Sequence, residues 1–383
     1  MLPTRPGEEL EPGLRFSRSS TELGLRLTFL VKDEVEVHVE VNPIEDELKF
    51  AVRTKRLGLA YRTGGAEHVD QKLGLRVCEA VARAIQRREH EVLARLARDA
   101  DASVQLEGTT RIREIRVSRI LELAGTPDAR FYTLSPYVGC LIGCRFCYAQ
   151  SRLNPIRSLL HQPKLRWGSY VDVRVNAAEV LAEALRALPR RPIKFCPIVS
   201  DPYQAVEQRA QVTRRCIEVL RDAEDPPPSM VMTRSSLILR DFDLITETPR
   251  IWVGASIPTI DDEVRKHFEP RAASIPERLE MLRRFKRAGV KRCVIVQPML
   301  PGNITALADG LAEVVESVSI GVLRGEQGAE EDFAEAEYSH CRDEAWQRDA
   351  ALELKEGLEG RGVSVWLSEL PPEVAAWRPQ GSP

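Results

Sequence analysis

Three of the eight cysteines in this 383-residue chain, Cys140, Cys144 and Cys147, stand within eight positions in the spacing C-x3-C-x2-C. Thiolates select soft metals, namely zinc, cuprous copper and the iron of iron–sulfur clusters. A structural zinc site takes four protein ligands, and the sequence has no second C-x2-C pair to complete one. A cubane cluster differs, because three cysteines hold three irons and leave the fourth iron open to an exogenous ligand. The spacing therefore favours an iron–sulfur cluster with an open position.

The elements around this loop follow a regular pattern. Continuously apolar runs alternate with amphipathic segments, as in a buried parallel sheet with crossover helices. The predicted strands are 131–134, 193–199, 229–233, 251–257, 292–300 and 318–323, and the predicted helices lie at 176–188 with Asn176 as N-cap, at 212–224, from Ser236, at 276–289 and at 303–315. About six β/α units predict an α/β fold, a partial or complete (β/α) barrel, and a doubly wound open sheet fits the same pattern. In a barrel the chemistry gathers at the carboxyl ends of the strands, where the cysteine loop lies.

The N-terminal part has a different pattern. Within residues 25–64 the stretches LRLTFLV, EVEVHVEV and ELKFAVR alternate apolar and polar residues with period two, which predicts a small antiparallel sheet. Residues 75–98 carry apolar side chains at mostly helical spacing and predict an amphipathic helix. We place a boundary near Gly108, because residues 99–126 are polar and hard to assign. The predicted domains are an N-terminal α+β accessory domain (1–108), the barrel (109–335), and a C-terminal helix and strand that cover the barrel (336–383).

Composition limits the class of protein. Lys and Arg number 55 against 57 Asp and Glu, so the total charge does not call for a polyanionic partner. No apolar run approaches the roughly 18 residues that indicate a membrane span. The polar, Pro- and Gly-rich start has no secretion signal, and irregularly spaced cysteines favour free thiols or metal ligation over disulfides. We expect a soluble cytoplasmic protein.

The cysteine loop and the aromatic residue after it, Tyr148, resemble the signature of the radical S-adenosylmethionine (SAM) superfamily. Between about residues 115 and 325, further stretches resemble the spore photoproduct lyase-like (SplB-type) branch, among them TLSPYVGC, SDPYQAVEQRAQVTRRCIEVL, MTRSSLILRDFDLI and VQPMLPG. The resemblance implies a [4Fe-4S] cluster whose open iron binds the amino and carboxylate groups of SAM. One electron from the cluster would cleave SAM to a 5′-deoxyadenosyl radical, and a low-potential ferredoxin or flavodoxin would supply that electron.

The resemblance also implies roles for single residues. The cluster ligands would be Cys140, Cys144 and Cys147, and the cofactor contacts would be Tyr148 on the adenine, Ser200 and Asp201 on the methionine moiety, and Arg234 and Ser256 on the SAM carboxylate. Arg234 replaces a lysine of the relatives, and an arginine fork can bind a carboxylate bidentately. Ser200 and Asp201 fit an Asp-Pro turn that closes a strand equally well.

Three charged residues after the fourth predicted strand, Glu269, Arg271 and Arg278, could line the ribose and carboxylate end of the cofactor. We expect instead that they lie at the solvated start of a helix, which is the commoner place for such a charged stretch.

The hydrogen-atom donor is the point at which the resemblance fails. Spore photoproduct lyase uses a cysteine a few residues before the Ser-Asp pair, and here Ile198 fills that position. The nearest thiol, Cys196, is two residues earlier and would point to the same face of a strand. Tyr338 and Cys341 lie after the last predicted strand, where the barrel mouth would be covered, and are further candidates. The cysteines at 78, 216 and 293 fit packing roles.

Two substrate classes remain open. One is DNA with a pyrimidine lesion, as in the SplB-type proteins, and the other is a peptide or protein that the N-terminal domain recruits, for example by strand addition. A non-enzymatic cluster scaffold is disfavoured, because it has no use for a SAM pocket.

Overall fold

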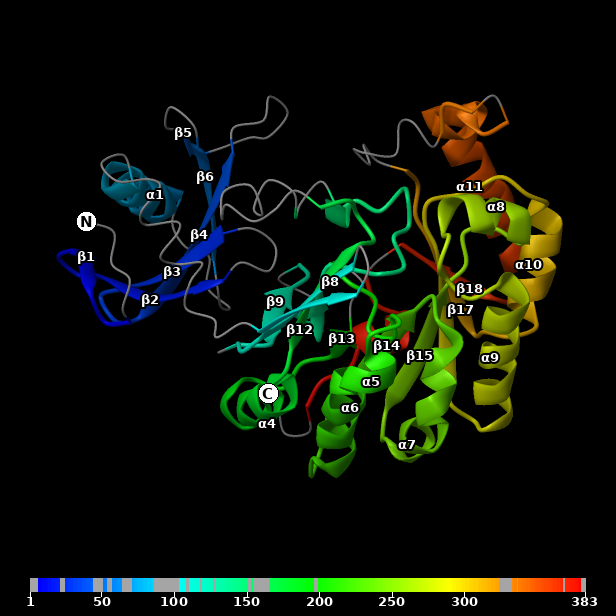
Figure 1. Ribbon diagram of the computed structural model, residues 1–383, viewed down its shortest axis with the longest axis horizontal. Helices are drawn as coiled ribbons and strands as arrows, with labels where there is room; N and C mark the ends of the chain where they lie inside the picture. The colour runs from blue at the N-terminus through cyan, green and yellow to red at the C-terminus, as the bar shows by residue number, and fades with distance from the viewer. Residues whose placement is uncertain are drawn as a thin grey trace. The chain divides into compact units, whose positions relative to one another are not determined.

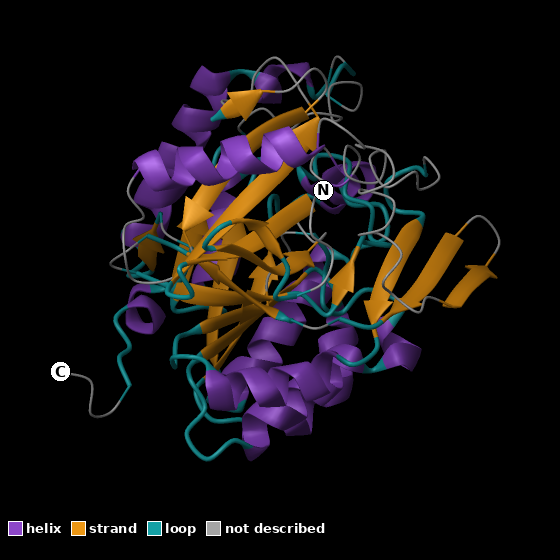
Figure 2. Cartoon of the chain, turned by 90° about the vertical axis from the view of Figure 1, so that its left-hand side faces the viewer, coloured by secondary structure: helices purple, strands orange, loops and turns teal. Residues whose placement is uncertain are grey.

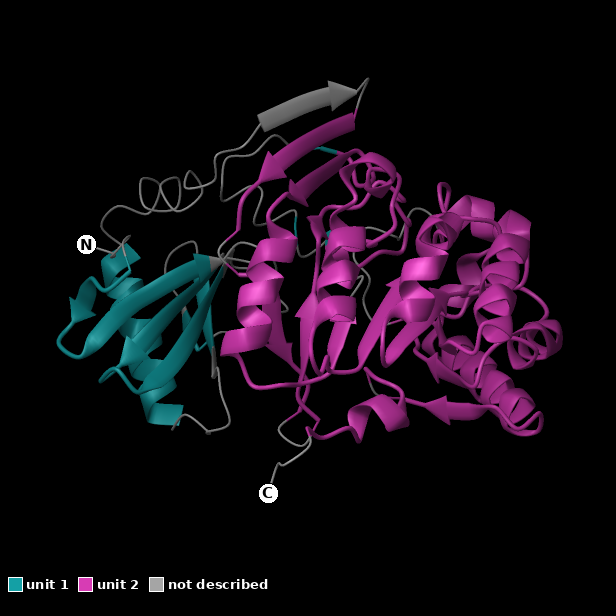
Figure 3. Ribbon diagram, turned by 90° about the horizontal axis from the view of Figure 1, so that it is seen from below, with its two compact units in different colours: residues 1–101, 150–165 teal, residues 102–149, 166–383 magenta. Residues whose placement is uncertain are grey.

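The computed structural model describes residues 6–20, 25–43, 51–53, 57–63, 71–85, 103–107, 110–117, 119–126, 129–150, 153, 165–195, 199–323, 333–335, 337–367 and 369–379. The chain forms two compact units, Met1–Asp101 with Gln150–Leu165, and Ala102–Ala149 with Arg166–Pro383 (Figure 3). The predicted three-part division at residues 108 and 335 stays a prediction.

The described part of the N-terminal unit contains an antiparallel sheet with helix α1 against it (Figure 1). Its strands are β1 (Glu9–Glu11), β2 (Leu14–Ser20), β3 (Leu25–Val31), β4 (Val35–Pro43), β5 (Val52–Arg53) and β6 (Leu57–Thr63), in the order β1-β2-β3-β4-β6-β5. Alternate residues of β3 and β4 pack against α1 (Gln71–Ile85) in one apolar core. The predicted sheet and helix are confirmed. Strands β1 and β2 precede the predicted residues, β6 lies outside the three predicted stretches, and the helical pattern beyond residue 85 lies outside the described residues.

The larger unit contains a sheet of seven parallel strands with one antiparallel strand, β9 (Leu121–Ala124), at its edge. The parallel strands are β10 (Phe131–Leu134), β13 (Ile193–Phe195), β14 (Ser229–Thr233), β15 (Ile251–Ser256), β16 (Lys291–Val296), β17 (Ser317–Ile320) and β18 (Ser364–Trp366). Their order in the sheet follows the chain without reversal, whereas a doubly wound sheet reverses at a switch point. The predicted partial (β/α) barrel is therefore confirmed, and Figure 2 shows its strands with the helices against them.

The helices of this unit are α4 (Ala177–Ala187), α5 (Glu207–Ala210), α6 (Val212–Asp222), η1 (Ser236–Asp241), α7 (Phe242–Glu247), α8 (Asp262–Phe268), α9 (Ile275–Arg287), α10 (Ile304–Ala312), η2 (Ser339–Arg342), α11 (Glu344–Glu359) and α12 (Pro372–Ala375). Local capping explains where several begin, as in the capping box of Ser274 and Glu277 at α9. Asn176 occupies the predicted N-cap of α4, but its side-chain amide instead bonds both backbone groups of Val117 at 2.8 Å.

The two faces of the parallel sheet have separate cores. Residues such as Val231, Val253 and Val318 face the helices in the main apolar core. The opposite, inner face carries Met230, Trp252, Cys293 and Trp366, and it packs against Leu370 and Val374 of the C-terminal segment. The end of the chain thus covers the inner face around Met230, Trp252 and Cys293, toward the amino ends of β14 to β16.

A second, four-stranded sheet supports the cysteine loop. It consists of β11 (Tyr137–Val138), β12 (Tyr170–Arg174), β8 (Thr110–Ile115) and β7 (Ser103–Glu107) in that order. The polar region that the sequence pattern left unassigned is therefore β7, β8 and β9. None of the helices in the described ranges is both long and apolar enough to cross a membrane.

Candidate active site

The cysteine loop leaves the carboxyl end of β10 and begins with the short strand β11. Gly139 and Gly143 have positive φ angles of 84° and 66°, so the loop turns twice through backbone conformations that favour glycine. A Cβ at Gly139 would also stand 2.6 Å from the carbonyl oxygen of Tyr170 in β12. Cys140 and Cys144 are buried and Cys147 is half-buried. The loop is thus tightly wound, with two of its three thiols away from solvent.

Gln204 fixes the backbone on both sides of Cys140. Its side-chain oxygen accepts the N–H of Leu141 at 2.7 Å, and its side-chain nitrogen donates to the carbonyl of Gly139 at 3.3 Å and to the Ser200 hydroxyl at 2.7 Å. Gln204 itself is buried. The sequence interpretation did not assign it a role, although it stands in the SDPYQ stretch that carried part of the resemblance.

The donor set fits an iron–sulfur cluster. Burial, joined by the charges of Asp201 and Cys147, raises the pKa of Cys140 to about 12, while backbone N–H groups of Ile142 and Asp201 favour its thiolate. Such N–H···S contacts suit the sulfurs of a bound cluster. Burial also raises the pKa of Cys144 well above its ordinary value, so cluster binding must displace protons from these thiols. Within the described ranges no three His, Cys, Asp or Glu side chains are gathered as a metal site, so this fit rests on the chemistry of the loop.

Next to the loop lies a buried triad of charges. The Nε of Arg234, after β14, donates to Oε1 of Glu269 at 2.5 Å, and Nη2 of Arg278 forms an ion pair with Oε2 of Glu269 at 2.5 Å. The side chains of Glu269 and Arg278 are 0% exposed. The expectation that these residues lie at a solvated helix start is therefore wrong, because each charge is paired inside the protein. Arg271, in contrast, is exposed, and it donates to the Gly168 carbonyl at 2.6 Å.

The triad contains two arginines and one carboxylate, so it has one positive charge in excess, and only the Nε of Arg234 is bonded within it. Burial lowers the pKa of Arg234, but the charges of Cys144 and Glu269 more than offset this, so its pKa is raised and the guanidinium stays charged. Its two Nη groups have no hydrogen-bond partner among the described residues. The buried hydroxyl of Ser256, at the end of β15, likewise has no partner there. These groups fit a carboxylate.

Ser200 and Asp201 bond the protein itself. The carboxylate of Asp201 accepts from the N–H of Tyr203 at 2.8 Å, the Thr233 hydroxyl at 2.7 Å and the N–H of Arg234 at 2.7 Å. Burial raises the pKa of Asp201, while these bonds oppose that rise. The pair joins the loop to the end of β14, and direct contact with SAM stays a prediction.

The structure brings two of the three predicted hydrogen-atom donors to the loop. Tyr338 and Cys341 belong to the same apolar cluster as Cys140 and Cys144, and the ring of Phe268 lies 5.1 Å from that of Tyr338. Burial raises the pKa of Cys341 to about 12, and its sulfur lies 3.2 Å from Nε2 of His340. Tyr148 is 37% exposed. Cys196 and Ile198 lie outside the described residues.

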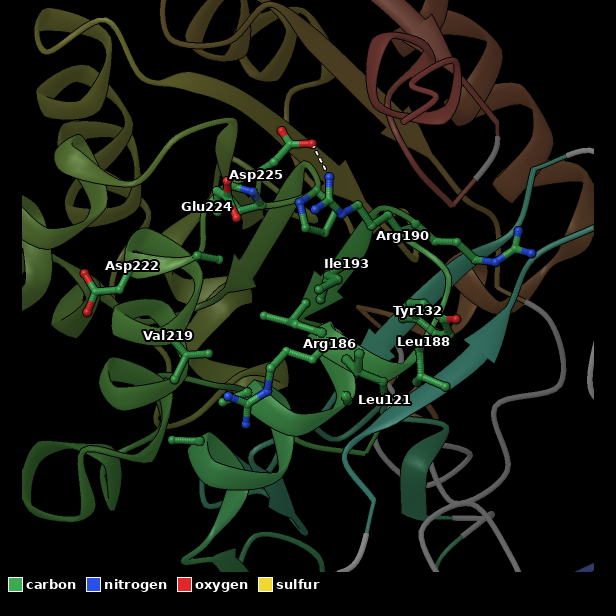
Figure 4. A pocket seen from close by; sticks show the side chains of 18 of the residues that line it. Leu121, Tyr132, Arg186, Leu188, Arg190, Ile193, Val219, Asp222, Glu224 and Asp225 are labelled. Atoms are coloured by element: carbon green, nitrogen blue, oxygen red, sulfur yellow. Dashed lines mark hydrogen bonds and ion pairs between the residues drawn. The ribbon is translucent and has the colours of Figure 1, made fainter. Parts of the chain in front are cut away.

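A pocket of about 830 Å³ lies between α4 and α6 and contains none of the predicted site residues (Figure 4). Some of the charged residues at its rim form ion pairs with one another, for example Arg190 with Asp225 at 2.5 Å. We therefore place the active site at the cysteine loop and not in this pocket.

Comparisons with known proteins agree with this placement. Residues 134–305 match the model of the radical SAM superfamily. An uncharacterized protein of Methanocaldococcus jannaschii is 26% identical over 50% of this chain and 69% of its own length, and one of Mycobacterium tuberculosis is 30% identical over 51% and 56%. The chain thus spans just over half the length of the mycobacterial relative. A radical SAM Nα-GlyT isomerase of Pseudomonas phage M6 is 24% identical over 44% of this chain and 33% of its own length.

Solved structures of spore photoproduct lyase share the fold. A tyrosine-to-phenylalanine mutant of that enzyme aligns with a TM-score of 0.50 at 18% identity, over 67% of this chain and 82% of that one. The matched region of the superfamily model contains the cysteine loop, Arg234, Ser256 and the buried triad. The chain is therefore an enzyme that carries a radical SAM domain at residues 134–305, and the chemistry of that domain uses a [4Fe-4S] cluster, S-adenosylmethionine and a reductant.

Proposed function

We propose that this enzyme is of the spore photoproduct lyase-like branch and abstracts hydrogen from a pyrimidine lesion in DNA. The observation that carries the proposal is the buried cysteine loop beside Arg234 and Ser256, whose Nη and Oγ donors have no hydrogen-bond partner among the described residues. Spore photoproduct lyase in complex with dinucleoside spore photoproduct has the same fold, with a TM-score of 0.50 over 66% of this chain. The sequence stretches shared with that branch support the same assignment.

In this proposal Cys140, Cys144 and Cys147 hold the cluster. The cluster and SAM, when bound, supply a 5′-deoxyadenosyl radical. The residues of this chain fix and shield the reacting groups: Gln204 holds the loop on both sides of Cys140, and the apolar cluster that includes Phe146 and Phe268 keeps water from the thiols.

Four further groups complete the cofactor site. Arg234 and Ser256 bind the SAM carboxylate through their unpaired donors, and Glu269 orients Arg234. Tyr148 packs on the adenine. Ser200 bonds Gln204, which holds the loop, and Asp201 accepts the N–H of Arg234. In the proposal both residues also contact the methionine moiety of SAM.

A hydrogen atom must return to the product radical. We assign this role to Tyr338 or Cys341, whose membership of the loop cluster supports it, with Cys196 as the third possibility. Because Ile198 replaces the cysteine of the lyase, the final product need not be that of the lyase.

The electron donor is a low-potential ferredoxin or flavodoxin, and a cytoplasmic location, where thiols stay reduced, is part of the proposal. The alternative, a peptide substrate recruited by strand addition to the N-terminal domain, has less support. The edge strands β1 and β5 have three and two residues, which leaves few backbone groups for a new strand.

The test is reductive cleavage of SAM by the reconstituted enzyme. The full chain, loaded with iron and sulfide without oxygen and reduced with dithionite, should form 5′-deoxyadenosine from SAM. A Cys144→Ala variant should form none, whereas Cys216→Ala, which removes a thiol from α6, should retain the activity. Lesion-containing oligonucleotides should then be converted and candidate peptides should not. Cleavage that persists in Cys144→Ala would contradict the site, and conversion of peptides alone would contradict the substrate.

A further inference from the structure

Four residues, three of them with hydrogen-bonding side chains, form a row across the inner face of the barrel. The strand register places Ser256 opposite Ile295, Ile295 opposite Ser319, and Ser319 opposite Trp366. Their neighbours Val294, Val318 and Val365 belong to the helix-facing side, so the row faces inward. The four residues lie at the carboxyl ends of β15 to β18, which is the reactive end of a barrel.

The row contains hydrogen-bonding groups to which no described residue bonds. The Oγ of Ser256 and the Nε1 of Trp366 are buried and have no partner among the described residues. Ser319 is 8% exposed, and no hydrogen bond of its hydroxyl to any described residue is present. Buried polar groups in native proteins almost always have partners, so a row of such groups points to a bound molecule.

Gln297 lies next to this row, beyond the carboxyl end of β16. It follows β16 two residues after Ile295, so it continues on the same face, and its side chain is exposed with no partner among the described residues. Its amide lies across Gly321: a Cβ there would come within 2.6 Å of the Cδ of Gln297. The missing side chain at Gly321, two residues beyond Ser319, thus leaves the space that the amide occupies.

This group lies at the same site as the cysteine loop. Leu300 and Leu323, which follow Gln297 and Gly321, belong to the apolar cluster of Cys140 and Cys144. The side chain of Gln347, in α11, joins these segments by accepting the N–H groups of residues 299 and 323 at 3.2 and 3.0 Å. A molecule in contact with Gln297 therefore lies at the mouth of the reactive barrel.

We infer that Gln297, Ser319 and Trp366 recognise the imide edge of a pyrimidine ring in the substrate, an inference that rests on the proposed function. An imide has one N–H between two carbonyls and needs one acceptor and two donors. A glutamine amide supplies an acceptor beside a donor, while a hydroxyl and an indole N–H supply further donors. All three side chains are uncharged, which suits a base and not a phosphate.

A peptide amide fits this set less well. It offers one N–H and one carbonyl, so it would leave buried donors at Ser319 or Trp366 without partners. The surplus of donors over acceptors in the site favours the imide.

The experiment measures binding to the reconstituted, unreduced enzyme with SAM present. The probes are dinucleoside spore photoproduct, its N3-methylated form and an N-acetyl dipeptide amide, with dissociation constants from equilibrium dialysis. We expect Gln297→Leu and Gly321→Ala each to weaken binding of the photoproduct about tenfold, and Gln208→Leu, an exposed glutamine of α5, to leave it unchanged. N3-methylation should weaken binding to the unaltered enzyme, but not to Gln297→Leu.

The inference is overturned if the photoproduct does not bind, if it binds equally well to Gln297→Leu, or if the dipeptide amide binds instead and depends on Gln297. The formation of 5′-deoxyadenosine separates this failure from a failure of the proposed function. Cleavage of SAM that persists in Gln297→Leu, while photoproduct binding falls, supports recognition by Gln297. If the unaltered enzyme does not cleave SAM, the proposed function itself is contradicted.

Discussion

Gln204 and Leu141 are joined by a 2.7 Å hydrogen bond, in which the side-chain oxygen of the glutamine accepts the backbone N–H directly after Cys140. The same side chain donates to the carbonyl of Gly139, directly before Cys140. One amide thus bonds the loop on both sides of Cys140, a proposed cluster ligand, and groups that orient ligands affect metal affinity strongly.

Gln204→Leu should therefore weaken the cluster more than the fold. The carbonyl of Gly139, which is buried, and the N–H of Leu141, which is half-buried, lose their partner, at up to about 1–3 kcal/mol each. We expect less iron per chain after reconstitution and an altered electron paramagnetic resonance spectrum of the reduced cluster. Gln208→Leu, an exposed change in the next helix, serves as control. A normal spectrum in Gln204→Leu would show that the loop holds its shape without this amide.

Glu269→Gln should destabilise the protein strongly. Glu269 is the anion between two arginines, Arg234 and Arg278, and its neutralisation leaves buried positive charge without compensation. Breaking a buried pair in this way costs about 3–5 kcal/mol. The free energy of unfolding in urea measures the effect.

The matched control is Glu263→Gln in the neighbouring helix α8. Glu263 is 80% exposed and pairs with Lys266, so its loss should cost less than about 1 kcal/mol. Equal losses in the two variants would mean that the buried triad has no special role in stability.

The barrel was predictable because its signal is local. Apolar runs such as 229–233 and amphipathic stretches such as 276–289 keep their period in the sequence, and the strands formed where these patterns lie. The cysteine loop was predictable for the same reason, since all three thiols fall within one short segment. The short strands β7 to β9 were missed because their polar residues show no clear period.

The rest of the site depends on tertiary contacts. Glu269 and Arg278 look like residues of a solvated helix start. In the structure they pair with each other, and Arg234 approaches from another β/α unit to pair with the same carboxylate. Gln297 stands in VQPMLPG, a stretch that carries part of the resemblance, but its relation to Gly321 arises from two adjacent strands and is not visible in the sequence. A single sequence does not contain these pairings as a periodic pattern.

Gly168→Ala should disturb the cysteine loop. Gly168 has a φ of 89°, and a Cβ there would come within 2.2 Å of Nη2 of Arg271 and 3.0 Å of the Cα of Gly143. The end of the exposed Arg271 side chain can move aside, so we expect only the contact with the Gly143 backbone to add a cost, about 1 kcal/mol beyond backbone strain, and iron content to fall. Gly362→Ala isolates the strain, since its φ is 77° and nothing lies within 4 Å of its Cβ position. Iron content and the midpoint of urea unfolding are measured for both variants. If Gly168→Ala and Gly362→Ala lower the midpoint equally, backbone strain alone explains the loss of stability.

Asp262 should make stability depend on pH in the acid range. Hydrogen bonds from Arg265 lower its pKa from 3.8 to about 2, a shift that burial partly opposes. A depressed pKa stabilises the folded state above the unfolded value, and this contribution is lost as pH falls from about 4 to about 2. The difference in unfolding free energy between the unaltered protein and Asp262→Asn should therefore shrink over that interval. Urea titrations at several pH values measure it, with the exposed Asp349→Asn as control, and a difference that grows toward acid would contradict the assignment.

Tyr338→Phe tests the return of the hydrogen atom. The change removes the phenol but retains the ring that packs 5.1 Å from Phe268 and 4.6 Å from His267, so the apolar cluster should persist. If the phenol donates the atom, the variant forms 5′-deoxyadenosine at the normal rate but much less repaired product, because the product radical is not quenched. Phenol hydrogens exchange with solvent, so the unaltered enzyme in D2O should place deuterium in the product. If Tyr338→Phe forms the normal amount of product with the normal deuterium content, the donor is not Tyr338. The role then falls to Cys341, whose exchangeable thiol lies in the same cluster. In that case Cys341→Ala should form 5′-deoxyadenosine at the normal rate but much less product.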